Sequence, residues 1–226
     1  MEVKPARPAW QVAVLVMIAI GGVLGGSLYA RSRLTPAPHD TAKPATRAAL
    51  VYDRPRPLAP FTLVDEAGAA ATKATLSGHW SLLFFGYTHC PDVCPATLAE
   101  LARVRERLAD LPRDRQPAVY LVSVDPGRDD VATLAGYVHF FAPDFHALTG
   151  EPAALEAFTR GLGVAVIVRR PAADQPAADY TVDHTAAILL VDPAGAVVAL
   201  FPAPHQVAVI DADYRALVTA ASRTGP

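Results

Sequence analysis

Hydrophobic and polar positions divide the chain into an apolar N-terminal run, a proline-rich stretch and a long segment of alternating apolar and amphipathic patterns. In that segment, residues 81–87 and 118–124 are almost continuously apolar, which is typical of strands buried on both faces of a sheet. Residues 95–109 instead repeat an apolar residue every third or fourth position, as an amphipathic helix does. The pattern therefore predicts an α/β domain.

Turn and capping residues delimit the other elements. Gly163 ends one predicted helix, Asp129 or Asp130 caps another, and a turn at residues 192–195 joins two strands. The predicted strands are residues 61–64, 81–87, 118–124, 186–191 and 196–201. The predicted helices are residues 95–109, 129–141, 152–162 and 211–222. With a parallel pair and an antiparallel hairpin, this order predicts one α/β sandwich with a central mixed sheet over residues 57–226.

Before this domain, residues 12–29 form an 18-residue run without a charged side chain. As a helix the run spans roughly 27 Å at about 1.5 Å per residue, close to a hydrocarbon core of about 30 Å. A cleaved signal peptide is the alternative, but Leu28 stands where a small residue is wanted before the cut. We expect a transmembrane anchor at residues 12–30, after a short cytoplasmic N-terminus at residues 1–11.

The stretch between anchor and domain, residues 31–56, contains four prolines and few apolar residues, which predicts an extended linker. Lysines and arginines lie on both sides of the anchor, so charge alone leaves its orientation open. Because a short N-terminus before a globular domain usually stays cytoplasmic, we expect a single-pass protein of a bacterial-type inner membrane, with the domain facing the periplasm. Glycines four residues apart within the anchor suit close helix–helix contact and predict a weak homodimer.

Composition narrows the function classes. A chain of 226 residues with 52% hydrophobic residues can build a sizeable core, and two cysteines exclude a disulfide-dense scaffold. Residues 1–56 carry 8 Lys and Arg against 3 Asp and Glu, a net charge of +5. Residues 57–226 carry 12 against 19, a net charge of −7. A domain this acidic repels phosphate backbones, so we expect no nucleic-acid partner.

The two cysteines, Cys90 and Cys94, follow a buried strand and precede a helix. A proline follows each of them, which favours an irregular turn at Cys90 and places Cys94 at or near the helix N-cap. Backbone N–H groups at a helix start favour negative charge, so we expect a lowered thiol pKa there. Such a turn can bring both sulfur atoms to one exposed spot.

Three interpretations of this pair remain open. A structural disulfide would close a very short loop and remove little entropy from the unfolded chain. A redox-active dithiol is the second, although three residues separate the cysteines where two are usual. A metal site is the third, since two thiolates and an imidazole form a soft cage of low coordination number.

The third ligand has to come from the seven histidines. His184 lies directly before an apolar strand, where it can face a helix N-terminus on the same edge of the sheet. His89 adjoins Cys90, but neighbouring side chains point in different directions. The others lie in loops, in the linker or at the end of a helix and are expected to be solvated or capping. Spacing alone leaves the choice open.

Four motifs of this sequence resemble those of the Sco/SenC family of membrane-anchored, thioredoxin-like copper-binding proteins. They are FGYTHCPDVCP at residues 85–95, SVDPGRD at 123–129, LTG at 148–150 and VDHT at 182–185. The resemblance runs from about residue 60 to about residue 217 and implies a thioredoxin-like fold. It also implies that Cys90, Cys94 and His184 are copper ligands.

The resemblance further implies a copper chaperone that helps assemble the dinuclear copper site of cytochrome c oxidase. Its expected partners are the copper-site subunit of that oxidase or other copper chaperones. The expected ion is copper in an exposed site, with Cu(I) preferred and Cu(II) as the alternative. Asp92, Asp125 and Asp183 match family positions and are expected around the ligands or facing a partner. The alternative is a thiol–disulfide oxidoreductase that uses Cys90 and Cys94 to reduce the cysteines of that site or of another exported protein.

Overall fold

The computed structural model describes residues 44–170 and 180–223, together with positions 10, 17 and 22. The chain divides into two compact units, Met1–Ala42 and Lys43–Pro226. In the first unit only the three single positions are described, so the predicted anchor apart from positions 17 and 22, the spacing of its glycines and the first part of the linker lie outside the described residues. Within the described part, no helix has both the length and the apolar character needed to cross a membrane.

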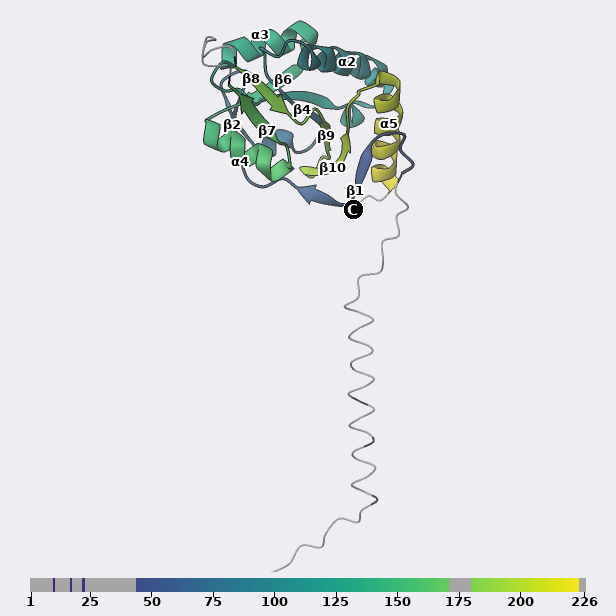
Figure 1. The fold of residues 1–226 in the computed structure, drawn as a ribbon. Coiled ribbons are helices and arrows are strands. Elements are labelled where there is room, and N and C mark those ends of the chain that lie inside the picture. The colour runs from purple at the N-terminus through teal and green to yellow at the C-terminus, as the bar shows by residue number, and fades with distance from the viewer. Residues whose placement is uncertain (1–9, 11–16, 18–21, 23–43, 171–179, 224–226) are drawn as a thin grey trace, which may run out of the picture. The chain divides into compact units, whose positions relative to one another are not determined.

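The second unit is built on a mixed sheet of eight strands in the order β1-β10-β9-β4-β5-β6-β2-β3 (Figure 1). The strands are β1 (Leu50–Pro57), β2 (Thr62–Asp65), β3 (Ala70–Thr72), β4 (Ser81–Gly86), β5 (Ala118–Ser123), β6 (Phe145–Thr149), β9 (Ile188–Val191) and β10 (Ala196–Phe201). Strands β4, β5 and β6 run parallel, and the other pairs are antiparallel. The predicted mixed sheet is confirmed, but the parallel group has three strands, since β6 was not predicted.

Helices cover both faces of this sheet. They are α2 (Val93–Arg107), α3 (Val131–Phe141), α4 (Pro152–Leu162) and α5 (Val207–Arg223), with short 3-10 turns η1 (Lys73–Leu76), η2 (Leu108–Asp110) and η3 (Arg113–Arg115). Helix α2 packs against α3 and α5. Helix α4 lies across the sheet from α2 and α3, where Phe158 packs on Phe61 with ring centroids 4.4 Å apart (Figure 1).

Strand β4 lies at the centre of the core. Every one of its six residues is buried, and it pairs with β5 on one side and β9 on the other. Burial on both faces explains why residues 81–87 lack polar alternation, as the sequence predicted. The C-terminal end of β4 leads directly into the cysteine turn, so a fully buried central strand precedes the cysteines.

Strand β1 occupies the second half of the segment predicted as a linker, the part around Val51 and Tyr52 that was expected to pack onto the domain. Residues 50–57 pair with β10 at the edge of the sheet. Just before them, the buried Asp213 carboxylate accepts the backbone N–H groups of Arg47, Ala48 and Ala49 at 2.7–2.9 Å. An edge strand tolerates proline and exposes most of its side chains, so it shows neither an apolar run nor a clear alternation.

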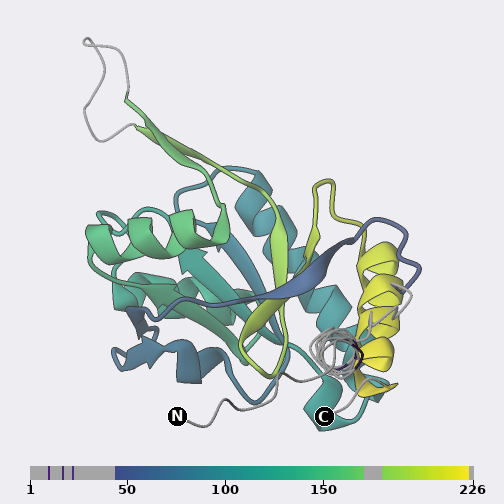
Figure 2. The same cartoon turned by 90° about the horizontal axis from the view of Figure 1, so that it is seen from below.

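A separate hairpin was also missed by the sequence pattern. Strands β7 (Val166–Arg169) and β8 (Thr181–His184) pair only with each other and form a second, two-stranded sheet. Figure 2 shows this hairpin extending away from the main sheet. Because most of its side chains are exposed, there is no buried face to impose a hydrophobic period on the sequence.

Candidate metal centre

The cysteine turn occupies residues 87–92, between β4 and α2. The Cys90 N–H donates to the Tyr87 carbonyl at 3.3 Å. Asp92 is the N-cap residue of α2 but makes no side-chain capping bond. Instead, the Cys90 sulfur accepts the backbone N–H of Cys94 at 3.4 Å, one of the N–H groups that a helix start leaves without an intrahelical partner. Cys94 is the second helical residue, close to the predicted position.

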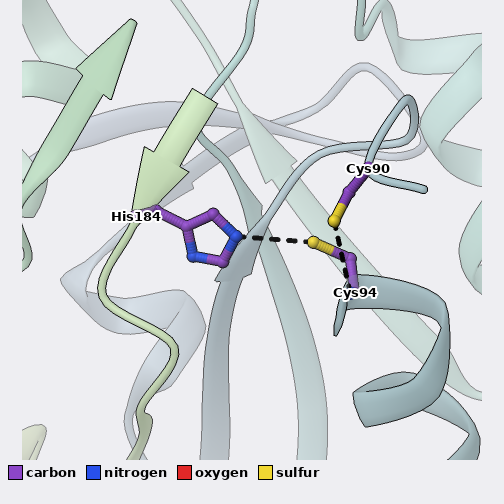
Figure 3. Close-up of side chains that lie close together, drawn as sticks. All are labelled: Cys90, Cys94 and His184. Carbon is purple, nitrogen blue, oxygen red and sulfur yellow. Dashed lines mark hydrogen bonds between the residues drawn. The ribbon is translucent and has the colours of Figure 1, made fainter. Parts of the chain in front are cut away.

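Three side chains from distant parts of the chain converge here (Figure 3). The Sγ atoms of Cys90 and Cys94 and one ring nitrogen of His184 all lie within 4.8 Å of one another, and both cysteines are free. Cys94 Sγ is 3.5 Å from His184 Nε2. His184 is the last residue of β8. The sequence had suggested a loop position directly before the next strand. Among the described residues, no other group of three His, Cys, Asp or Glu side chains meets in this way.

The surroundings of His184 favour a neutral imidazole. Nδ1 lies 3.4 Å from the Thr185 carbonyl, which assigns the ring proton to Nδ1 and leaves a lone pair on Nε2. Burial lowers the pKa of His184, against smaller opposing effects of the Thr185 carbonyl and Asp183. The rings of Phe84 and Tyr87 contact the imidazole edge-on, at centroid distances of 6.0 and 6.2 Å. The ring is therefore held with Nε2 facing the cysteines.

The thiol pKa of Cys94 and the exposure of the site both differ from the expectations. Burial raises the pKa of the Cys94 thiol, and the contact with Cys90 raises it further, whereas the helix start had predicted a lowered value. The site is also less exposed than expected, since Cys94 is 0% and Cys90 8% exposed. Desolvation outweighs the helix dipole because the sulfur lies in the core. Such a thiol keeps its proton until a cation displaces it.

Gly86, the last residue of β4, provides the space for the Cys94 sulfur. A Cβ atom at this position would lie 2.9 Å from Cys94 Sγ and 3.1 Å from Phe84 Cε1. Both distances are shorter than ordinary van der Waals contacts, so any larger residue displaces the sulfur or the strand. The sequence contained this glycine in the FGYTHC motif but gave no indication of its packing role.

The three aspartates predicted near the site lie in different environments, and none joins the cluster of ligand atoms. Asp92 is exposed at the start of α2, and Asp183 is exposed and paired with Arg169 at 2.6 Å. Asp183 and His184 are successive strand residues, so their side chains point to opposite faces. Asp125 is buried and bound to Arg128. Roles around the ligands or toward a partner stay predictions.

Asp129 was one of two candidate caps for helix α3, and the structure decides between them. Asp130, not Asp129, caps α3 by accepting the Thr133 N–H at 2.7 Å. The buried Asp129 carboxylate instead accepts hydrogen bonds from the Thr88 hydroxyl at 2.6 Å and the Ser123 hydroxyl at 2.7 Å. Burial raises its pKa, although these hydrogen bonds act in the opposite direction. Two consecutive aspartates in the sequence could have indicated this second role, because only one of them can occupy the cap position.

Comparisons with known proteins agree with this geometry. A family model described as SCO1/SenC matches residues 52–219. "Protein SCO2 homolog, mitochondrial" of Bos taurus is 35% identical over 183 residues, which cover 80% of this chain and 66% of the relative. The chain spans 48–66% of the length of the first three curated relatives it matches.

Two solved structures are similar over most of the second unit. The Bradyrhizobium japonicum ScoI structure with copper bound is 36% identical, with a TM-score of 0.61, and the match covers 70% of this chain and 98% of that one. The Arabidopsis thaliana ScoI structure with copper bound is 30% identical, with a TM-score of 0.65, and the match covers 74% and 98%. From the matched family model and these relatives together, the chain belongs to the SCO1/SenC family.

Proposed function

We propose that this chain binds copper through Cys90 Sγ, Cys94 Sγ and His184 Nε2 and assists assembly of the dinuclear copper site of cytochrome c oxidase. The observation that carries the proposal is the convergence of these three atoms within 4.8 Å. Membership of the SCO1/SenC family and the copper bound in related ScoI structures support it. Copper is cargo in this function, taken up from one protein and given to another.

The donor set fits Cu(I). Thiolate sulfur and imidazole nitrogen are soft or intermediate ligands, and Cu(I) accepts them at low coordination number. Zinc in a structural site takes four ligands, and within the described residues no fourth His, Cys, Asp or Glu joins the three. His184 offers its Nε2 lone pair without losing a proton. The cysteines lose their thiol protons when copper binds, so uptake releases protons.

Release requires the reverse exchange. A partner ligand approaches the site and takes a coordination position, while a thiolate or the imidazole leaves the ion. A disulfide between Cys90 and Cys94 would consume two of the three ligands, so only the dithiol form carries Cu(I). Copper loading is thus coupled to the redox state of the cysteine pair.

The proposal includes a membrane setting, which rests on the sequence. Residues 12–30 anchor the chain in a bacterial-type inner membrane, and the copper-binding domain faces the periplasm. The partners are the copper-site subunit of cytochrome c oxidase or other copper chaperones. The acidic domain, with a net charge of −7 over residues 57–226, presents a field that favours a basic partner surface.

A thiol–disulfide reductase is the second candidate. The observation that favours it is the proximity of two free thiols, with their sulfur atoms within 4.8 Å. In that reaction Cys90 and Cys94 form a disulfide, and a disulfide of the substrate protein takes up the two electrons and two protons as two thiols. This chemistry needs both cysteines but not His184.

One experiment separates the two functions. The full chain, His184→Ala and the control His139→Ala, which replaces an exposed histidine on α3, are titrated with Cu(I) against a competing chelator. We expect His184→Ala to lower copper affinity by at least about tenfold, and His139→Ala to leave it unchanged. Equal affinities for all three proteins would remove His184 from the site and make the reductase the better interpretation.

A further inference from the structure

The two halves of the metal site meet a common loop, residues 124–130, between β5 and α3. We infer that two adjacent residues of this loop are positioning residues: Arg128 holds the histidine half and Asp129 holds the cysteine half. This inference rests on the proposed function, since it supposes that the site binds copper. It goes beyond the proposed function by identifying the loop that sets the separation between the nitrogen ligand and the sulfur ligands.

Arg128 binds the segment that carries His184. Its guanidinium carbon lies 3.7 Å from the ring centroid of Tyr180, and its Nη1 donates to the Tyr180 carbonyl at 3.1 Å. Its Nε donates to Asp125 at 2.5 Å, and the other oxygen of that carboxylate accepts the Tyr180 hydroxyl at 2.6 Å. Tyr180 immediately precedes β8, so these contacts fix the start of the strand that ends at His184.

These contacts matter because, among the described strands, the main sheet gives the hairpin no hydrogen-bonded neighbour. Strands β7 and β8 pair only with each other, and Ile167 and Val168 are 51% and 53% exposed. Near its base, the Val182 N–H donates to the Tyr87 hydroxyl at 3.3 Å. Arg128 also lies over the Tyr87 ring, 5.6 Å from its centroid. The cation and two tyrosine rings therefore join the hairpin to the body of the protein.

Asp129 binds the other half. Its carboxylate accepts the Thr88 backbone N–H at 3.2 Å and the Thr88 hydroxyl at 2.6 Å, two residues before Cys90. The Ser123 hydroxyl at the end of β5 donates to the same carboxylate at 2.7 Å. The cysteine turn is thus fixed to the neighbouring strand by a buried acceptor with three donors.

The loop can hold both halves because it is itself closed. The N–H groups of Arg128 and Asp129 donate to the Asp125 carbonyl at 3.1 and 3.0 Å, and the Asp125 N–H donates to Ser123 Oγ at 3.1 Å. Arg128 and Asp129 are consecutive in this closed loop, so the loop holds the histidine half and the cysteine half at a set separation. Residues that orient metal ligands from outside typically change metal affinity by about 10- to 100-fold when replaced.

The test measures Cu(I) affinity of the full chain with Arg128→Gln or Asp129→Asn, each alone and combined with His184→Ala. Because Arg128 acts through His184, we expect Arg128→Gln to lower affinity about tenfold or more alone and to have no further effect in the His184→Ala background. Asp129→Asn acts through the cysteines and is expected to lower affinity in both backgrounds. Equal losses from Arg128→Gln in both backgrounds would overturn the assignment.

Matched controls separate positioning from stability. Arg215→Gln removes an arginine that binds Asp110 and Asp211, and Asp213→Asn removes another buried acceptor of three N–H groups. Neither contacts the site, so both are expected to leave copper affinity unchanged. If Arg128→Gln does not fold, Arg128→Lys keeps the charge but loses the planar stacking and takes its place.

A readout without copper keeps the inference distinct from the proposed function. In the metal-free chain, the nearby rings of Phe84 and Tyr87 are expected to shift the NMR signals of His184. We expect Arg128→Gln to move these signals toward those of an exposed histidine, and Asp129→Asn to speed alkylation of Cys90. Unchanged signals and rates overturn the positioning roles. Failure of the unsubstituted chain to bind copper, with these changes present, overturns the proposed function alone.

Discussion

The sulfur half and the nitrogen half of the site come from regions of very different construction. Cys90 and Cys94 follow β4, whose six residues are all buried, and lead into a helix packed against two others. His184 ends a two-stranded hairpin that lies outside the main sheet. The comparison teaches that one site can combine two ligands from a buried strand and helix with a third ligand from a hairpin outside the main sheet, which packs on the core through Val182.

This difference bears on dynamics. Elements with few buried apolar contacts open locally at lower free energy than core strands. We therefore expect the sulfur ligands to be fixed before copper binds and the imidazole to be the ligand whose position changes most readily. The following substitutions and conditions test that division, beginning with the largest expected effect.

The strongest test removes a core ligand. Cys94→Ala leaves one thiol and one imidazole, and we expect copper affinity to fall by more than about 100-fold, beyond the range for residues outside the ligand set. Bound copper per chain after dialysis against a Cu(I) chelator measures the effect. Thr97→Ala, a buried substitution one turn further along α2, is the control and should retain copper. Retention of copper by Cys94→Ala would show that the hairpin side dominates binding.

Gly86→Ala tests whether the core fixes the sulfur position. The added methyl overlaps Cys94 Sγ, and overpacking of this kind costs about 1–3 kcal/mol in the free energy of unfolding. Copper affinity should fall as well, because the sulfur moves. Denaturant unfolding and copper titration measure both effects. Gly136→Ala on α3, where the added Cβ meets no atom within 4 Å, should be neutral or stabilising. Unchanged affinity in Gly86→Ala would mean that the sulfur side adapts easily.

The pH dependence of copper affinity should come from the cysteine thiols. Because the pKa of Cys94 is raised, its thiol is protonated at neutral pH, and copper must displace that proton. Affinity should therefore rise with pH, by about tenfold per pH unit for each proton displaced. The pKa of His184 is lowered, so its imidazole competes for protons only below about pH 6.5. Chelator titrations above that pH should give the same slope for the unsubstituted chain and His184→Ala; a shallower slope in the variant would contradict this division.

The smallest effect is expected from Asp183→Asn. Asp183 is adjacent to His184 in sequence, but its ion pair with Arg169 is exposed on both sides. Such pairs contribute no more than about 1 kcal/mol to stability. We expect the free energy of unfolding to change by less than that and copper affinity to stay the same. A tenfold loss of affinity would place the carboxylate in contact with the ligand environment after all.

The sequence predicted the core side of this comparison better than the hairpin side. The bounds of α4 and β10 agree with the predicted residues 152–162 and 196–201, because a glycine cap and a tight turn mark them. Strand β4 was readable because burial on both faces leaves a continuous apolar run. Strands β1, β7 and β8 expose most of their side chains, so their residues record no hydrophobic period.

Long-range contacts account for the rest. The family motif placed Cys90, Cys94 and His184, and the structure brings them together, yet no spacing rule links Thr88 to an aspartate 41 residues later. The raised pKa of Cys94 was missed for a similar reason. A helix start is visible in the sequence, whereas the burial that outweighs its effect depends on residues that only the fold brings near.

The unequal burial of the two cysteines also predicts the order in which their thiols react. Cys90 is 8% exposed and Cys94 0%, so an incoming thiol or alkylating reagent encounters Cys90 first. Cys94 is expected to react only when the structure around it opens, and its raised pKa keeps the thiolate population small. We therefore expect Cys90 to exchange faster than Cys94, and Cys94 to limit the rate of complete exchange at this site.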